Sequence, residues 1–238
     1  MAVALDTTLV GAASVNGFAT FVLSNFSTGG ANRLVLVTID NSNGASNFVV
    51  SSVTATGLTF SLQTPSLEKW PGFGHTEVWG AWASSTQTNK AVTVNFTGAV
   101  QASARTYCFS GTVATGTPGA AIGAKATANW FNNVNPTTVN VITTAANSLV
   151  IASVGITGDT TVTAGTGQTN DGTTSLAGQQ STVANLRQNA ITAASGSIVT
   201  MSGTLGASFG WGIIGIEILE GTAPPPPAPN TTNFFQFF

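Results

Sequence analysis

No stretch of this chain sustains the apolar spacing that an amphipathic helix needs, whereas short alternating runs recur along its whole length. In the clearest run, residues 92–97, Val92, Val94 and Phe96 alternate strictly with polar residues. Such alternation places apolar side chains on one face of a β-strand and polar side chains on the other. The sequence therefore predicts antiparallel β-structure with one buried and one solvated face.

Clusters of Gly, Asn, Ser and Thr separate these runs at the spacing typical of sandwiches and barrels. We expect an all-β, two-sheet antiparallel β-sandwich, jelly-roll-like, over residues 1–221. The strand candidates are residues 2–10, 17–24, 32–40, 48–54, 76–84, 90–97, 102–110, 137–143, 147–156, 181–188, 197–202 and 208–219.

The last strand candidate lies in the glycine-rich stretch 206–220. Ile214, Ile216 and Ile218 share one face at period two, while Trp211, Ile213, Gly215 and Glu217 share the other. Glycine costs a helix about 1 kcal/mol per residue relative to alanine, so four glycines in this stretch argue against a helix. We predict a β-strand that is buried on at least one side.

A weak internal echo suggests two similar halves. Residues 31–35 (Ala-Asn-Arg-Leu-Val) resemble residues 146–150 (Ala-Asn-Ser-Leu-Val), and residues 92–98 with 102–103 resemble residues 198–203 with 207–208. Chance reuse of Val, Thr and Gly in a β-rich chain explains such echoes equally well, so both interpretations stay open here.

Charged residues make up only 6% of the 238 residues, against about 25% in average soluble domains. The surface must therefore be covered mainly by Ser, Thr, Asn, Gln and Gly. Such a surface gives little electrostatic repulsion between copies, which suits a subunit packed against neighbours. A neutral secreted β-domain is the alternative. The six Lys and Arg residues, at positions 33, 69, 90, 105, 125 and 187, form no cluster, so we expect no nucleic-acid partner.

Residues 1–20 contain no Lys or Arg and no continuous apolar core, so they do not resemble a secretory signal. No run is long and apolar enough for a membrane helix, and we expect no membrane partner. The single cysteine, Cys108, alternates with Thr106 in an apolar run, which predicts an inert buried thiol.

The succession of strand types resembles a β-sandwich domain of bacteriophage structural proteins and bacterial surface proteins. It runs from residues 34–37 (Leu-Val-Leu-Val) through 53–57 (Val-Thr-Ala-Thr-Gly), 77–79 (Glu-Val-Trp) and 92–94 (Val-Thr-Val) to the closing strand 211–218. The resemblance covers about residues 30–220 and is diffuse. It implies a virion or extracellular surface location and carries over no catalytic position.

Catalytic motifs are weak. Residues 206–210 match the G-x-S-x-G nucleophile motif at Ser208, but that motif requires a following helix and a later histidine. The only histidine, His75, lies upstream in a Gly/Pro-rich loop and is expected to be solvated. Residues 40–44 (Asp-Asn-Ser-Asn-Gly) offer oxygen ligands for calcium, but they contain a single acidic residue. We therefore predict a turn there and not a calcium-binding loop. We predict no enzyme activity, no metal site and no cofactor.

Paired carboxylates, which a glycosidase needs, cannot be judged from spacing alone. Asp159 and Asp171 flank a Thr/Gly-rich span, and Glu68 and Glu77 flank the loop that contains Trp70. The sequence does not show whether either pair converges.

Aromatic residues support a second hypothesis, a carbohydrate-binding or adhesion module. Trp70 and Trp130 lie in predicted loops and are possible contact residues for a glycan. Trp79 and Trp82 point to opposite faces of one predicted strand, so at most one of them can join a flat platform.

The C-terminal segment, residues 222–238, is predicted to be an arm that leaves the sandwich. Its five prolines cannot continue a sheet, and it ends in an uncharged aromatic cluster, Phe234, Phe235, Phe237 and Phe238. Exposed, this cluster would be prone to aggregation, so we expect it to be covered. Docking on a neighbouring subunit is the favoured role, and docking in a groove of its own domain is the alternative.

These features predict a non-enzymatic structural subunit of a multi-subunit assembly, most simply a bacteriophage capsid-decoration or tail-associated protein. Its partners would be neighbouring protein subunits, in a homo-oligomer or a virion.

Overall fold

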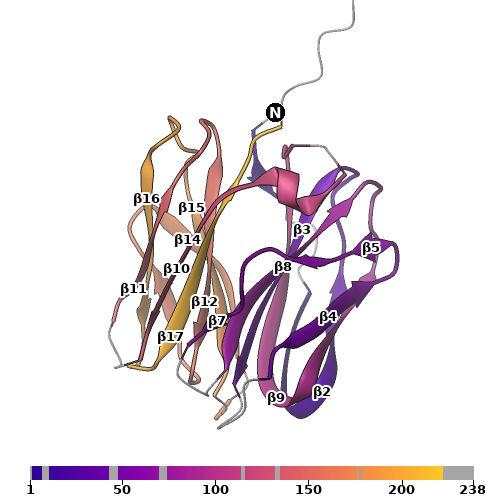
Figure 1. Ribbon diagram of the computed structural model, residues 1–238, viewed down its shortest axis with the longest axis vertical. Helices are drawn as coiled ribbons and strands as arrows, with labels where there is room; N and C mark the ends of the chain where they lie inside the picture. Colours follow the sequence, from indigo (N-terminus) through magenta and orange to yellow (C-terminus); the bar gives the residue numbers. More distant parts are fainter. Residues whose placement is uncertain are drawn as a thin grey trace, which may run out of the picture.

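The chain folds into two all-β lobes joined by one short 3-10 helix (Figure 1). The structure is a computed structural model that describes residues 2–6, 11–42, 48–69, 74–113, 116–131, 135–175, 177–178 and 180–221. Every strand pairing in it is antiparallel, which confirms the predicted all-β antiparallel sandwich. Instead of two sheets the strands form three, of nine, five and three strands. The predicted arm, residues 222–238, lies outside the described residues.

The first lobe comprises β1 (Ala4–Leu5), β2 (Ala12–Phe26), β3 (Arg33–Ser42), β4 (Val50–Ala55), β5 (Leu58–Thr59), β6 (Ser61–Leu62), β7 (Leu67–Glu68), β8 (His75–Ala83) and β9 (Lys90–Ser110). The helix η1 (Pro118–Ala121) leads into the second lobe, which comprises β10 (Ile122–Trp130), β11 (Thr137–Ile142), β12 (Leu149–Ile156), β13 (Val162–Ala164), β14 (Gln168–Ser175), β15 (Thr182–Gln188), β16 (Ile198–Leu205) and β17 (Trp211–Ile218).

Both lobes use one strand arrangement. In the second lobe, β10-β17-β12-β15 form one layer and β11-β16-β13 form the other. In the first lobe the corresponding layers are β2-β9-β3-β8 and β2-β9-β4, because β2 and β9 are long enough to run through both. The glycines at 206 and 210 and the Asn135-Pro136 step lie where the second lobe breaks these long strands into two. Chain order and pairing partners therefore repeat from one lobe to the other.

The sequence echoes fall at corresponding places in this repeat. Asn32 and Asn147 adopt the left-handed conformation, with φ of 56° and 57°, just before the central strands β3 and β12. The second pair of similar stretches lies on β9 and β16. The sequence match aligns Val92 with Ile198, whereas the structure places Val199 at the position equivalent to Val92. Val92 is buried whereas Ile198 is exposed, and it is Val199 that packs toward the core of the second lobe.

Among the described residues, three apolar clusters form the core, one inside each lobe and one between them. The cluster between the lobes, which we call the interlobe seam, joins β3, β8 and β9 of the first lobe to β10, β12 and β17 of the second. Its strand residues are Leu34, Leu36, Val78, Tyr107, Phe109, Ile122, Leu149, Ile151, Ile214, Ile216 and Ile218. The large layers of the two lobes thus pack face to face (Figure 1).

Strand β17 belongs to two of these clusters. Ile214, Ile216 and Ile218 face the interlobe seam, while Trp211 and Ile213 face the core of the second lobe. The predicted strand and its two faces are confirmed, and both faces are buried. Alternation between two cores explains why this strand shows almost no polar residue.

The sequence analysis missed six strands of the described chain. Four of them, β5, β6, β7 and β13, have only two or three residues, and the two longer ones, β10 and β14, lack a clear apolar alternation. Strand β10 presents Ala124, Ala126 and Ala128 toward the second core, and alanine has low β-propensity. Strand β14 is polar throughout and forms the edge of the five-stranded sheet. Edge strands need no apolar face, so periodicity cannot reveal them.

The buried position of Ile216 gives a direct test of this architecture. We expect Ile216→Asp to prevent folding, because a carboxylate without a partner in the interlobe seam costs about 4–5 kcal/mol or more. Ile198→Asp is the matched control, because that isoleucine lies on the surface. Soluble yield and thermal melting check both variants, and a wild-type melting curve for Ile216→Asp would contradict the assignment of this face.

Candidate functional site

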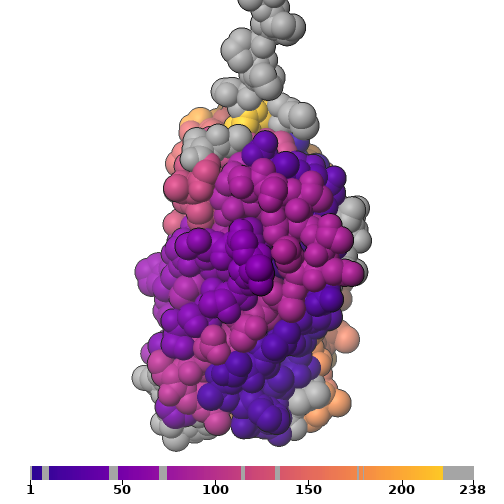
Figure 2. All heavy atoms as spheres, turned by 90° about the vertical axis from the view of Figure 1, so that its right-hand side faces the viewer, coloured from indigo at the N-terminus to yellow at the C-terminus, as the bar shows by residue number. Residues whose placement is uncertain are grey.

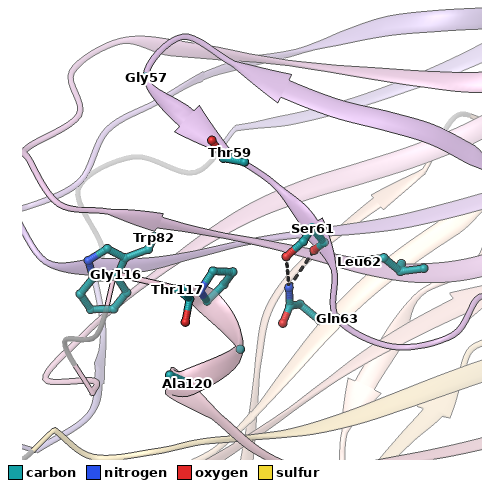
Figure 3. A pocket seen from close by; sticks show the side chains of 11 residues that line it. Gly57, Thr59, Ser61, Leu62, Gln63, Trp82, Gly116, Thr117 and Ala120 are labelled. Atoms are coloured by element: carbon teal, nitrogen blue, oxygen red, sulfur yellow. Dashed lines mark hydrogen bonds between the residues drawn. The ribbon is translucent and has the colours of Figure 1, made fainter.

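A hollow of about 610 Å³ opens on the first lobe where β5, β6 and η1 approach the half-buried ring of Trp82 (Figure 3). A volume of this size suits a small-molecule or sugar ligand, for which about 300–1,000 Å³ is typical. Its lining residues are Gly57, Thr59, Ser61, Leu62, Gln63, Trp82, Gly116, Thr117, Pro118, Gly119 and Ala120.

The polar groups of this hollow are hydroxyls and one amide. Gln63 donates from Nε2 to the backbone oxygen of Ser61 at 2.8 Å and to its Oγ at 2.9 Å (Figure 3). Lys125 of the second lobe donates from Nζ to the backbone oxygen of Gln63. This hydrogen bond ties the residue that follows β6 to the second lobe. None of the lining residues is charged. A face of indole beside hydroxyl and amide groups can stack on and hydrogen-bond a neutral polyol.

Of the two predicted contact tryptophans, the structure describes Trp130, which does not line this hollow. Trp130 is 48% exposed at the end of β10, where it pairs in register with Trp211. Trp70 lies outside the described residues. The prediction that Trp79 and Trp82 lie on opposite faces is confirmed, since Trp79 packs on the first-lobe core and Trp82 on the interlobe seam.

The expectation that His75 is solvated is wrong. His75 is the first residue of β8, is buried, and lies opposite Glu68 across the β7–β8 pair. Burial lowers the pKa of its imidazole, so the neutral form is favoured. Ser208 precedes another strand, β17, and not the helix that a nucleophile elbow requires.

Residues 40–42 do not form the predicted turn but continue β3, and residues 43–47 lie outside the described residues. Asp40 is completely buried and forms an ion pair with Lys69, whose Nζ lies 2.6 Å from Oδ1. Sequence reasoning missed this pair because strands β4 to β7 separate its members along the chain. Asp40 is therefore not available to a calcium ion from solvent.

Polar contacts across the lobes surround this pair. Ser181 of the second lobe donates from Oγ to Asp40 Oδ2 at 2.8 Å, and Asn185 donates from Nδ2 to Thr38 Oγ1 at 2.8 Å. Nearby, Ser103 donates from Oγ to the backbone oxygen of Ser181 at 3.0 Å. One end of the interface is thus polar and the other, the interlobe seam, is apolar.

Three of the other carboxylates named from the sequence, Asp171, Glu77 and Asp159, have defined partners. Asp171 forms an ion pair with Arg187 at 2.8 Å. Glu77 is buried and accepts hydrogen bonds from Trp79 Nε1 at 2.8 Å and from the Val50 amide at 3.1 Å. Asp159 is exposed and accepts from the Gly178 amide at 3.3 Å. Within the described part of the chain, no three His, Cys, Asp or Glu side chains are grouped as a metal ion would require.

Cys108 is a free, buried thiol, as predicted. Burial raises the pKa of this thiol to about 12, so the thiolate is negligible at neutral pH. A catalytic or redox role for this cysteine has no support in its environment.

Comparison of the chain with protein-family models, with curated proteins and with solved structures gave no match. In the described ranges there is also no helix with the length and apolar character to cross a membrane. A functional argument for this protein therefore depends on its own geometry.

Glu217 is a buried carboxylate held by backbone amides. It accepts from the amides of Ala124 and Thr144 at 2.8 Å, from the Thr144 hydroxyl at 2.7 Å, and from the Ala145 amide at 3.1 Å. Burial opposes ionisation, but the hydrogen bonds from Ala124 and Thr144 outweigh it and hold the pKa of Glu217 below its ordinary value of 4.5.

Because the folded-state pKa is lowered, the stabilisation from Glu217 is present above pH 4.5 and is lost as the pH falls below it. We expect Glu217→Gln to destabilise the protein by about 2–3 kcal/mol at neutral pH, since the amide cannot accept from all these donors. The loss should shrink in acid. Urea unfolding at pH 7 and below pH 4 measures it, with the exposed Asp159→Asn as control; equal losses at both pH values would contradict the assignment.

Proposed function

We propose that the protein is a non-catalytic structural subunit of a multi-subunit assembly, of the capsid-decoration or tail-associated kind found in bacteriophage virions. Residues 222–238 would attach it to a neighbouring subunit. The observation that carries this proposal is the placement of the charged side chains.

All fourteen charged side chains lie in the described residues, yet only Lys125 and Asp159 are exposed. The others are buried or half-buried, several of them in the ion pairs Arg33–Asp6, Lys69–Asp40 and Arg187–Asp171. Most charged side chains are therefore at least half-buried, and the outer surface consists largely of uncharged polar groups. Copies of such a surface repel one another weakly and can pack closely without burying unpaired charge.

Exposed apolar side chains lie on this uncharged surface in both lobes. Ile142 and Ile198 face each other across β11 and β16 and are 61% and 67% exposed. In the first lobe, Phe18 and Val22 of β2 are 59% and 55% exposed. Figure 2 shows the outer face of this lobe, formed mainly by chain segments that precede η1. These side chains suit contacts with neighbouring subunits.

The virion setting is supported by the strand-pattern resemblance, and the role of the arm by its sequence. The arm combines prolines, which prevent strand pairing, with Phe234, Phe235, Phe237 and Phe238. Burying two phenylalanine side chains stabilises an interface by about 3–6 kcal/mol before ordering costs.

Deletion of residues 222–238 tests the proposal. We expect a folded, soluble protein that no longer assembles, because the deletion removes the docking segment and leaves both lobes intact. Light scattering coupled to size exclusion and electron microscopy of the particles measure assembly. A full-length control with all four phenylalanines changed to serine should behave like the deletion, and normal assembly of both variants would refute the docking role.

The hollow beside Trp82 favours a second candidate function, binding of a neutral carbohydrate. The notable feature is the absence of charge among its lining residues together with an indole face and several hydroxyls.

For this candidate we expect binding on a glycan array to disappear in Trp82→Ala and to survive in Trp130→Ala. Loss in Trp70→Ala or Trp130→Ala alone would instead point to the loop tryptophans. Absence of binding to every neutral glycan, with wild-type folding confirmed by circular dichroism, would leave only the structural role.

A further inference from the structure

The ion pair between Lys69 and Asp40 differs from the other pairs of the described chain. Both of its side chains are 0% exposed, whereas Arg33 and Arg187 in the other pairs are 22% and 24% exposed. It is also the pair that contains an amine, which can act as a nucleophile, in place of a guanidinium.

Hydroxyl groups surround the two reactive groups. Lys69 donates from Nζ to Ser42 Oγ at 3.1 Å. Ser181 donates to Asp40 Oδ2 at 2.8 Å, and Thr76 donates to Oδ1 at 3.3 Å. Both carboxylate oxygens are therefore positioned by donors, and Oδ1 is the one that faces the amine.

Complete burial disfavours the charged forms of both partners. Burial raises the pKa of Asp40 to about 6, although the charge of Lys69 opposes this shift, and burial lowers the pKa of Lys69. A proton transfer from Nζ to Oδ1 along their hydrogen bond converts the ion pair to a neutral amine and a neutral carboxylic acid. These are the forms in which an amine can attack a carboxyl carbon.

We propose that Lys69 and Asp40 condense to an intramolecular amide bond. The lone pair of Nζ attacks Cγ of the protonated carboxyl, and the negative charge that develops on Oδ2 is stabilised by the Ser181 hydroxyl. Protons from Nζ pass to Oδ1, the Cγ–Oδ1 bond breaks, and Oδ1 leaves as water. One C–N bond forms, one C–O bond breaks, and no oxidant, metal or energy source is required.

Proximity makes this reaction feasible. Nζ already lies 2.6 Å from one oxygen of the carboxyl group that it would attack. Well-oriented intramolecular groups reach effective concentrations of about 10⁵–10⁸ M, and exclusion of water disfavours the reverse hydrolysis. The amide product also removes a buried ion pair, which is costly to desolvate.

The second lobe closes this site. Ser181 comes from the segment before β15, and a side chain at Gly155 of β12 would collide with Asp40 Oδ1 and Thr76 Oγ1. Solvent is therefore excluded from the pair only after the lobes have packed together. We infer that the bond forms after folding and links β3 to the segment that follows β7.

Intact mass spectrometry of the purified full-length chain tests the proposal. We expect a mass lower by one water molecule than the mass given by the sequence, once any removal of Met1 is counted. A mass that still equals the sequence mass after prolonged incubation of the folded protein overturns the proposal.

Peptide mapping locates the bond. Residues 34–69 contain no internal Lys or Arg, so trypsin releases peptides 34–69 and 70–90 from an unmodified chain. Because trypsin does not cleave after an acylated lysine, the modified chain should give one peptide, 34–90, that lacks one water. Additional cleavage by a Glu-specific protease, after Glu68 and Glu77, should leave residues 69–77 attached to fragment 34–68, which contains Asp40.

Two variants separate the bond from a simple salt bridge. Lys69→Arg keeps the charge but cannot form this amide, so its mass should equal the sequence mass. Ser181→Ala removes the donor to Oδ2 and should increase the fraction of freshly purified chain that still has the full sequence mass. If Lys69→Arg fails to fold, the wild-type mass and peptide map still decide the question, and both are independent of whether the protein is a virion subunit.

Discussion

Burial of the large layers on both of their faces is the constraint on which the rest of this structure depends. Strands β3 and β12 are central in their sheets, and nearly every residue of each is buried. Neither lobe could keep this composition alone, because the removal of its partner would expose a face of Leu, Ile and Val side chains to water. The interlobe seam therefore makes two sandwiches into one folding unit, and it explains why charged residues are rare in the strands that form it.

The same constraint decides where the few charged groups lie. With both faces of the central strands covered, any polar residue they carry must find a partner inside. Asp40 pairs with Lys69, and Glu217 collects backbone amides from the segments around Ala124 and Thr144. The chain has few charged residues, and several of them serve as internal connections, so little charge remains on the surface.

Sequence reasoning reached the fold class and most strands, because alternation at period two is a local signal. The faces of residues 211–218 and the buried thiol of Cys108 followed from the same signal. It missed β10 and β14, whose alanines and polar residues show no apolar alternation, and the short strands β5, β6, β7 and β13. The ion pair of Asp40 and the hollow beside Trp82 were also missed, since each joins segments that are distant in sequence. His75 was misplaced because neighbouring glycines and Pro71 suggested a loop, whereas pairing of β8 with β3 and β7 buries it.

The repeat of one strand arrangement has a geometric consequence. Because the large layers face each other, the small layers of the two lobes point outward at opposite ends of the molecule (Figure 1). Exposed apolar side chains lie on both outer layers, on β11 and β16 in the second lobe and on β2 in the first. If copies were to join through these two outer layers, the contacts would be head-to-tail. Closure into a ring or growth into a filament would then depend on the rotation between successive copies, to which the angle between the two lobes contributes.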